Sequence, residues 1–256
     1  MSTRQGSDEI QVTAYHQHLL RDHERLSAFY EAIASTARGL TYDLGAGSGI
    51  LSFFASEYAD HVIAIEKDPR IAACAGENLS DLENVTVVNE DALEYEFSEM
   101  ADTIICEMLD TALIDEEQVP VLKRALRFLK EEGNVIPASV INAAEPVMIR
   151  GGSISYDENI RAPSAGPLQV YDRIDFRGRI PEKFRGILKL VASGSFNAIR
   201  ITSFTVPAEN IICGPTPMMN PPLLIPLGDT LEGGDFRVKL LYTMGGGLDS
   251  VKAELK

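Results

Sequence analysis

The sequence predicts an α/β domain with a doubly wound parallel sheet, followed by a β-rich domain. In the first half, short β-branched runs alternate with segments of helical apolar spacing, which is typical of a parallel sheet covered by helices on both faces. After Pro137 helical spacing becomes rare, and turn residues separate short apolar runs. This second pattern favours an antiparallel β-barrel or sandwich. We therefore expect one domain over residues 1–137 and another over residues 138–256.

The first half supplies each expected element in turn. Apolar residues at helical spacing predict a first helix over 11–37. Asp68 is placed to cap a later helix, with Pro69 at its first position. Gly133 is expected to close the last helix. The expected helices are 11–37, 50–58, 69–79 and 115–130, and the expected strands are 40–44, 61–66, 85–88, 103–106 and 135–136.

The second half contains apolar runs with the length of strands and few helical periods. Turn residues separate these runs, as they do in an antiparallel sheet. The expected strands are 147–149, 187–191, 199–204 and 236–242.

Composition narrows the class of protein. No apolar run reaches the roughly 18–20 residues of a membrane-spanning helix, and residues 1–8 lack the apolar core of a signal peptide. Three scattered cysteines and four histidines give no metal-binding cluster. We therefore expect a cytoplasmic protein with no structural metal and no membrane association.

The net charge of −15 is distributed unevenly. Residues 1–142 hold 26 acidic and 10 basic residues, whereas residues 143–256 hold 12 acidic and 13 basic ones. An acidic surface repels phosphate backbones and attracts cationic partners. A solvated surface that only keeps the protein soluble explains the same composition.

A glycine-rich loop with Gly45, Gly47 and Gly49 follows the first expected strand. Glycine lets the backbone turn tightly and approach a ligand without a Cβ clash. Glu66 ends the next strand, 23 positions after Asp43, where it can accept hydrogen bonds from the ribose hydroxyls of an adenosine. A strand before the loop and a helix after it predict a nucleotide-type cofactor at the strand ends.

The residues around this loop favour an amino-acid-bearing sulfonium over a dinucleotide. A dinucleotide fingerprint requires its third glycine at position 50, where the chain has Ile50. Asp43 can meet an ammonium group, directly or through water, and a dinucleotide offers no such group. Asp91 and Ala92 follow the third strand, where a side-chain acceptor and a backbone N–H can read an adenine edge.

The segment from Asp43 to Phe53 resembles motif I of class I methyltransferases, in the variant typical of the protein arginine methyltransferases. Residues 65–68 resemble the family's next motif, and residues 19–25 resemble the helix that covers the cofactor. The family places a β-barrel after a junction proline, here Pro137. The resemblance implies a Rossmann-like methyltransferase domain and S-adenosyl-L-methionine as the cofactor. The expected cofactor-binding residues are Arg25, Asp43, Gly45, Ala46, Gly47, Gly49, Glu66, Lys67, Asp91, Ala92 and Glu107.

The resemblance also implies two catalytic acids, Glu107 and Glu116. Glu107 ends a strand and Glu116 follows nine positions later, which matches the family's two-glutamate loop for the substrate guanidinium. Two carboxylates can make bidentate hydrogen bonds to a guanidinium and align one nitrogen with the sulfonium methyl. Asp115 and Glu117 stand beside Glu116, and any of these three acids can instead favour the N-terminus of the next helix.

One departure leaves the methyl acceptor open. The chain contains no tryptophan, so the family's Thr-His-Trp loop is not intact, and residues 218–222 are its nearest counterpart. We expect methyl transfer to a nitrogen nucleophile, with a protein or peptide as the acceptor. An RNA methyltransferase and a non-catalytic cofactor-binding scaffold are the alternatives, and the oligomeric state is not predicted. The RNA alternative depends on a stretch of basic and aromatic residues, namely Arg173, Arg177, Arg179, Lys183 and Arg185 with Tyr171, Phe176 and Phe184.

Overall fold

The computed structural model describes residues 21–256. The helix expected over residues 11–37 lies partly outside these residues. Within them, α2 spans His23–Thr36, and Asp22 caps its first turn by accepting a hydrogen bond from the Arg25 amide. Residues 19–20 of the segment that resembles the covering helix also lie outside the described residues.

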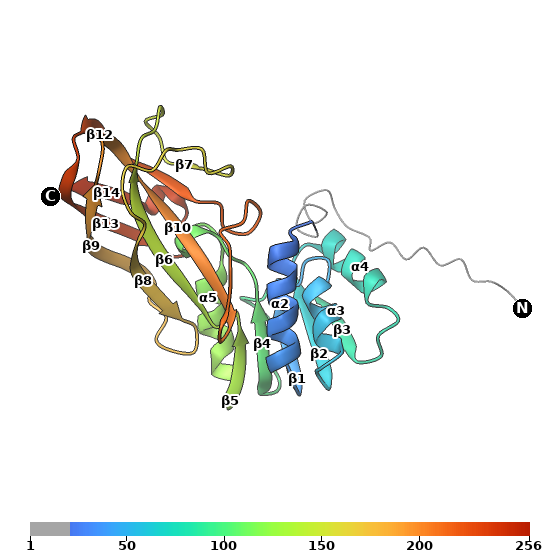
Figure 1. Ribbon diagram of the computed structural model, residues 1–256. Coiled ribbons are helices and arrows are strands. Elements are labelled where there is room, and N and C mark those ends of the chain that lie inside the picture. Colours follow the sequence, from blue (N-terminus) through green and yellow to red (C-terminus); the bar gives the residue numbers. More distant parts are fainter. Residues whose placement is uncertain (1–20) are drawn as a thin grey trace, which may run out of the picture.

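The first half forms a five-stranded parallel sheet in the order β3-β2-β1-β4-β5 (Figure 1). The parallel sheet expected from the sequence is therefore confirmed. The strands of a parallel sheet have nearly continuous apolar sequences because both faces of the sheet are covered. Its strands are β1 (Leu40–Leu44), β2 (His61–Glu66), β3 (Val85–Asn89), β4 (Ala101–Cys106) and β5 (Leu129–Ile136).

Helices connect these strands. The helix α3 (Ile50–Ser56) follows the glycine loop, and α4 (Pro69–Asn78) begins at Pro69 with Asp68 as its N-cap, as expected. The helix α5 covers only Gln118–Ala125, and a single 3₁₀ turn, η2 (Leu126–Phe128), follows it. The expected extent of 115–130 was too long. At the carboxyl end, Leu129 and Lys130 belong to β5, where pairing with β4 overrides helical propensity.

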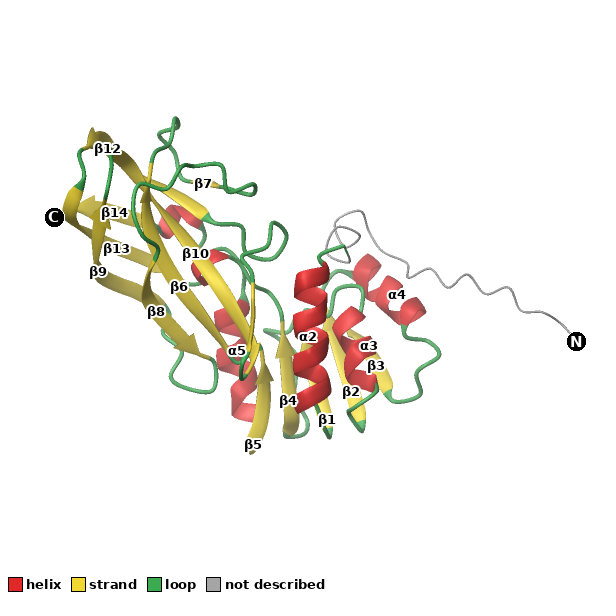
Figure 2. Cartoon of the chain, in the orientation of Figure 1, coloured by secondary structure: helices red, strands yellow, loops and turns green. Residues whose placement is uncertain are grey.

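The second half consists of antiparallel sheets (Figure 2). In the larger sheet the strand order is β7-β12-β10-β6-β8, with β11 paired to β10, and in the smaller one it is β14-β13-β9. In the first half, Gly133 was expected to close the last helix, but it lies inside β5. The strands are β6 (Ser139–Val147), β7 (Ser155–Tyr156), β8 (Gln169–Asp175), β9 (Lys183–Ala192), β10 (Phe196–Ala208), β11 (Ile211–Cys213), β12 (Leu223–Leu231), β13 (Gly234–Thr243) and β14 (Lys252–Leu255).

The two halves are packed together. One cluster of buried apolar residues includes Ile104 of β4 and Ile136 of β5 as well as Ile201 of β10 and Leu240 of β13. The helix α2 packs against α3 and also contacts β10 and β11, so it lies between the halves (Figure 1). Pro137 lies between β5 and β6, and the domain boundary at this residue stays a prediction.

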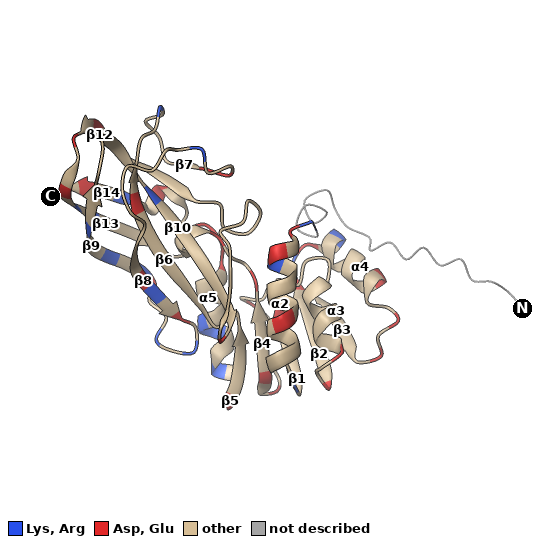
Figure 3. Cartoon of the chain, in the orientation of Figure 1, with Lys and Arg blue, Asp and Glu red and all other residues tan. Residues whose placement is uncertain are grey.

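Charged residues are distributed differently over the two halves. Lys and Arg recur along β8, β9 and the loop that joins them (Figure 3). In residues 21–256 no helix is long and apolar enough to cross a membrane. The same residues contain no group of three or more His, Cys, Asp or Glu side chains arranged to hold a metal ion.

Candidate active site

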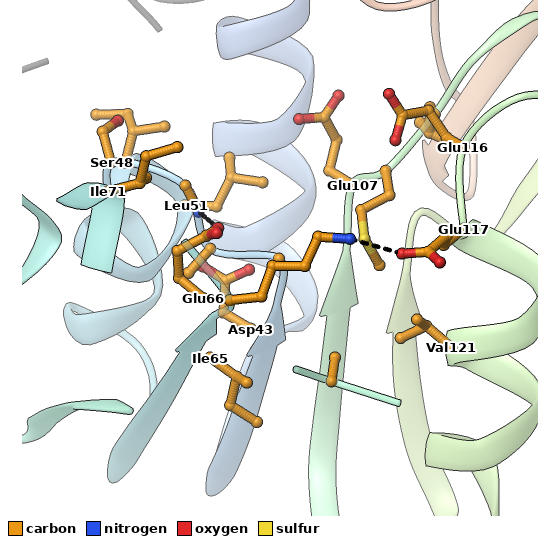
Figure 4. A pocket seen from close by; sticks show the side chains of 18 of the residues that line it. Asp43, Ser48, Leu51, Ile65, Glu66, Ile71, Glu107, Glu116, Glu117 and Val121 are labelled. Carbon is orange, nitrogen blue, oxygen red and sulfur yellow. Dashed lines mark hydrogen bonds and ion pairs between the residues drawn. The ribbon is translucent and has the colours of Figure 1, made fainter. Parts of the chain in front are cut away.

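A cavity of about 330 Å³ opens at the carboxyl ends of β1, β2 and β4. Ligands of open α/β sheets bind at this edge because the loops that follow the parallel strands converge there. Figure 4 shows Asp43 and Glu66 from the ends of β1 and β2, with Glu107 and Glu116 on the other side of the cavity.

The sequence-predicted residues come together at this cavity with one exception. Gly49 does not line it. This glycine caps α3 with φ of +87°, and a Cβ there would come within 2.6 Å of the Leu79 side chain. The left-handed backbone and the close approach of Leu79, at the end of α4, therefore explain why position 49 is a glycine. The predicted residues that line the cavity are Arg25, Asp43, Gly45, Ala46, Gly47, Glu66, Lys67, Asp91, Ala92, Glu107 and Glu116.

The glycine loop is held against the end of β2. The amides of Gly45 and Ala46 both donate to the Ile65 carbonyl at 2.9 Å, and the Gly47 amide donates to Oε2 of Glu66 at 3.0 Å. Gly45 and Gly47 adopt φ of +73° and +56°, which glycine tolerates without a Cβ penalty. A Cβ at Gly45 would also come within 3.0 Å of Met108. The loop therefore keeps bare backbone at the cavity.

Glu66 is fixed from two sides. Its Oε1 accepts a hydrogen bond from the Asp68 amide at 2.9 Å, while Oε2 accepts one from Gly47. Each carboxylate oxygen has a second lone pair. The side chain is therefore oriented toward the cavity and still able to accept two hydroxyl groups.

Asp43 is 1% exposed at the end of β1. Burial raises its pKa to about 7, although the Ser52 hydroxyl donates to its carboxylate at 2.6 Å and favours the charged form. The nearby Glu107 carboxylate also raises the pKa of Asp43. A cationic group in the cavity would favour ionised Asp43.

Glu107 forms a buried ion pair with Arg25 of α2. Nη1 of Arg25 lies 2.7 Å from Oε2 of Glu107, and their side chains are 2% and 13% exposed. Burial raises the pKa of Glu107, whereas the Arg25 guanidinium lowers it. A guanidinium carries five N–H donors, so Arg25 can donate to Glu107 and to a second anion at once. Pairing of Arg25 with the cofactor carboxylate stays a prediction.

Glu116 reaches the cavity from a loop that begins at Asp110. The Asp110 carboxylate accepts hydrogen bonds from the amides of Ile114, Asp115 and Glu116, at 3.0, 2.9 and 3.4 Å. Burial raises the pKa of Asp110 to about 7, even though these three amides favour its charged form. This one carboxylate therefore holds the backbone that carries Glu116.

The same loop is anchored to the second half of the chain. Ala112 and Leu113 adopt φ of +60° and +59°, which is uncommon for residues with a Cβ. The Ala112 amide donates to Oγ of Ser203 at 2.7 Å, and Ser203 in turn donates to Asn142 at 2.6 Å. Strained backbone persists where surrounding contacts over-determine it. Strands β6 and β10 thus help to position Glu116.

Two further features form the wall of the cavity. Lys67 pairs with Glu117 at 2.8 Å (Figure 4), and this contact raises the pKa of Lys67. Met218 and Met219, from the segment between β11 and β12, also line the cavity. This part of the wall is therefore formed by flexible thioether side chains, where the resemblance implies a histidine and a tryptophan.

Sequence reasoning missed three residues that support this site. Ser52 donates to Asp43, Asp110 holds the Glu116 loop, and the Gln118 side chain accepts a hydrogen bond from the Met108 amide at 2.9 Å. Ser52 carries a signal, because one helical turn after a glycine loop brings a hydroxyl close to the preceding strand. No sequence pattern points to Asp110 or Gln118, because their hydrogen-bond partners depend on the course of an irregular loop.

These residues fit S-adenosyl-L-methionine. The cavity volume lies within the range of small-molecule sites, roughly 300–1,000 Å³. Buried Asp43 suits an ammonium group, the fixed Glu66 carboxylate suits a pair of ribose hydroxyls, and the Arg25 guanidinium suits a carboxylate.

Comparisons with known proteins agree with this geometry. Residues 42–133 match a protein family described as a methyltransferase domain. A protein of Methanothermobacter thermautotrophicus is 72% identical over 96% of this chain and 99% of its own length. A protein of Methanocaldococcus jannaschii is 36% identical over 96% of this chain and 98% of its own length.

Further similarities concern arginine methyltransferases. Probable histone-arginine methyltransferase 1.3 of Arabidopsis thaliana is 32% identical over 48% of this chain, and the match spans 25% of that protein. The structure of the Trypanosoma brucei PRMT1 enzyme-prozyme complex with AdoHcy matches with a TM-score of 0.77 and 18% identity, over 95% of this chain and 96% of that one. This structural likeness shows a shared fold across both halves. The chain thus belongs to the family of the two methanogen proteins, and it is a class I S-adenosylmethionine-dependent methyltransferase that resembles the protein arginine methyltransferases.

Proposed function

We propose that this methyltransferase modifies a nitrogen of a cationic protein side chain, with arginine as the acceptor that the site fits best. The observation that carries the proposal is the ion pair of Glu107, whose carboxylate binds the guanidinium of Arg25 at 2.7 Å. A carboxylate placed to receive one guanidinium at the cavity is also placed to receive that of a substrate.

Glu116 is the second acid of the proposed acceptor site. Burial raises the pKa of Glu116. The pKa of Glu107 is raised by its own burial and also by the negative charge of Glu116. The Glu107 side chain is only 13% exposed, and a desolvated carboxylate gains more from a cation than an exposed one does. Cationic side chains are therefore favoured over neutral acceptors.

The proposed roles follow from these positions. When bound, S-adenosyl-L-methionine supplies an electrophilic methyl group on a sulfonium centre. Glu107 and Glu116 orient the acceptor nitrogen by hydrogen bonds and balance its positive charge. A carboxylate whose pKa is raised is also a better base for the proton that the methylated nitrogen releases. Asp43, Glu66 and Arg25 hold the cofactor in this proposal.

The RNA alternative loses its main support. Phe176 is fully buried, and the Tyr171, Phe184 and Tyr242 rings pack on one another with centroids 5.0 and 5.2 Å apart. Rings used in this way are not available to stack on bases. Measurable turnover of the cofactor would exclude the non-catalytic scaffold.

Two coarser expectations accompany the proposal. All three cysteines, Cys74, Cys106 and Cys213, are unpaired, which supports a reducing cytoplasmic location. Contacts between β6 and β9 and between β12 and β14 join the two antiparallel sheets, which supports a barrel-like second domain over residues 138–256.

The test is methyl transfer from radiolabelled S-adenosyl-L-methionine to arginine-rich peptides, lysine-rich peptides and RNA, each assayed separately. We expect label in the arginine-rich peptides. Glu107→Gln should lower turnover by about 100-fold or more while cofactor affinity changes only a few-fold, because it removes interactions made in the transition state.

Glu117→Gln is the matched control. Glu117 lines the same cavity but pairs with Lys67 and is 41% exposed, so its variant should retain most of the turnover. Label in RNA alone, undiminished in Glu107→Gln, would contradict both the acceptor class and the role of Glu107.

A further inference from the structure

A strongly basic surface lies on the second half of the chain, away from the cavity. It is the outer face of the small sheet β14-β13-β9, and we call it the basic face. The strand β9 alternates between exposed residues, such as Lys183, Arg185 and Lys189, and inward ones, such as Leu188 and Leu190. The seven cations of the basic face are Lys183, Arg185, Lys189, Arg237, Lys239, Lys252 and Lys256.

The strand register brings these cations together. Residues directly opposite each other in an antiparallel pair share a face. Arg237 of β13 is opposite Lys189 of β9, and Lys239 is opposite Glu254 of β14. Lys252 is opposite Leu241, which is itself opposite Arg185. The seven cations therefore form one continuous surface across three strands.

Few acids neutralise this surface. Asp235 and Glu254 lie on the same face, and Asp249 lines the hollow at one end of it. Glu254 pairs with Lys239 at 3.5 Å and with Lys256 at 3.3 Å. The other five cations form no salt bridge with any part of the chain that the structure describes.

The arrangement is costly unless an anion covers it. Like charges directly opposite each other, as at Arg237 and Lys189, destabilise a sheet. At one end of the face, a hollow is lined by Lys183, Arg185 and Lys252 and by one acid, Asp249, with Leu241, Thr243 and Ser250 completing the lining. Three cations against one carboxylate leave this hollow with a net positive charge, which suits a phosphate group.

We propose that the basic face binds the phosphate backbone of a nucleic acid, independently of its sequence. Protein–protein interfaces are depleted of lysine at their centre, whereas nucleic-acid interfaces are more polar and much more positively charged. The exposed apolar side chains here are the isolated Ile187 and Val191, at 56% and 42% exposure. The face carries no exposed aromatic ring, so backbone contacts provide the binding and base stacking does not.

This inference goes beyond methyl transfer. The basic face shares no residue with the cavity, so the nucleic acid is a docking partner and not the methyl acceptor. The net charge of −15 means that the rest of the chain repels phosphates. A nucleic acid therefore binds in one orientation, and the cavity stays open to protein acceptors.

The test measures binding of fluorescent 20-nucleotide oligo(U) and oligo(dT) by anisotropy at several salt concentrations. We expect binding at 50 mM salt that weakens steeply as salt rises, by a slope of about −0.7 per contacted phosphate on a double-logarithmic plot. The variant Arg185→Glu/Lys189→Glu/Arg237→Glu should weaken binding by about 30-fold or more. Melting temperature and cofactor affinity should stay unchanged, because all three side chains are exposed.

The matched control is Arg70→Glu/Arg150→Glu/Arg161→Glu. It makes the same change in net charge at exposed positions outside the basic face, and we expect at most a threefold loss of affinity. Equal losses in the two triple variants would overturn the proposal, as would the absence of binding at 50 mM salt. If polyglutamate binds as tightly as the oligonucleotides, the proposal is overturned and an acidic protein is the partner. Salt-sensitive self-association lost only in the first variant, without oligonucleotide binding, would identify a second copy of this chain as the partner.

Discussion

At the residue scale, the site is characterised by carboxyl groups held away from water. Asp43 is 1% exposed and Asp110 is 7% exposed, and burial raises the pKa of each to about 7. A group in this state gains or loses its charge near neutral pH. Cofactor binding and protein stability should therefore both depend on pH in this range.

Cofactor affinity should rise with pH because of Asp43. The ammonium group of the cofactor favours the ionised carboxylate, so binding to protein below pH 7 releases a proton. We expect affinity measured by calorimetry to rise by about five- to tenfold between pH 6 and 7 and to level off near pH 8. Asp43→Asn should bind more weakly and lose most of this dependence, and an unchanged slope would remove Asp43 from the ammonium site.

The stability of the cofactor-free protein should have the opposite dependence. The folded-state pKa of Asp43 is raised from its ordinary value of 3.8 to about 7. Its contribution is therefore fully present below about pH 4 and is lost as pH rises toward 7. We expect the free energy of unfolding, measured with urea, to fall between pH 4.5 and pH 8 in the unmodified protein. In Asp43→Asn this fall should be smaller by about 2–4 kcal/mol.

Glu66 provides a test of the cofactor's ribose site. Replacing it with alanine removes two acceptors, and we expect a loss of about 2–4 kcal/mol in cofactor binding. Glu66→Gln keeps one acceptor oxygen, so its cofactor affinity should lie between that of the unmodified protein and that of Glu66→Ala. Because the Glu66 carboxylate also holds Gly47 and Asp68, a melting curve should accompany the calorimetry. Unaltered affinity in Glu66→Ala would remove this residue from the site.

At the scale of elements, the loop between β4 and α5 brings Glu116 to the cavity and is anchored to the second half of the molecule. Its conformation combines a carboxylate at Asp110, left-handed backbone at Ala112 and Leu113, and an anchor at Ser203 of β10. The approach of Glu116 to the cavity therefore depends on strands that follow it in the sequence by more than 80 residues.

Asp110→Ala should test this dependence. The change leaves three amides without their acceptor, and we expect turnover to fall by about 10-fold or more while cofactor affinity stays within twofold. Asp115→Ala is the matched control, because it lies on the same loop with an exposed side chain and should retain turnover. Equal turnover in the two variants would show that the Asp110 carboxylate does not position Glu116.

Elements with strong local signals were the ones that the sequence could predict. Asp68 and Pro69 define the start of α4, and the glycine loop defines the end of β1. The end of α5 could not be predicted, because residues 129–130 continue its helical pattern and only pairing with β4 decides that they are a strand. Asp110 was missed for a similar reason, since its three partners follow a strained loop.

At the scale of the whole molecule, the division into a parallel and an antiparallel half could be predicted and their packing could not. Periodicity reports which face of an element is buried but not which neighbour buries it. The interleaved Tyr171, Phe176 and Phe184 illustrate this limit, because the same alternation suits a stacking surface and a core. The structure places these rings inside and leaves the neighbouring cations outside.

The shared core also has a consequence for synthesis of the chain. All strands of the parallel sheet have left the ribosome once residue 136 has emerged, whereas β6 meets its neighbour β10 only near residue 208. The 77 residues from 137 to Cys213, where β11 ends, take about 4–15 s at 5–20 residues per second. During that interval the nascent chain presents the side of α2 that later contacts β10 and β11. A chaperone that shields apolar helix surfaces would act on this chain before its last strands exist.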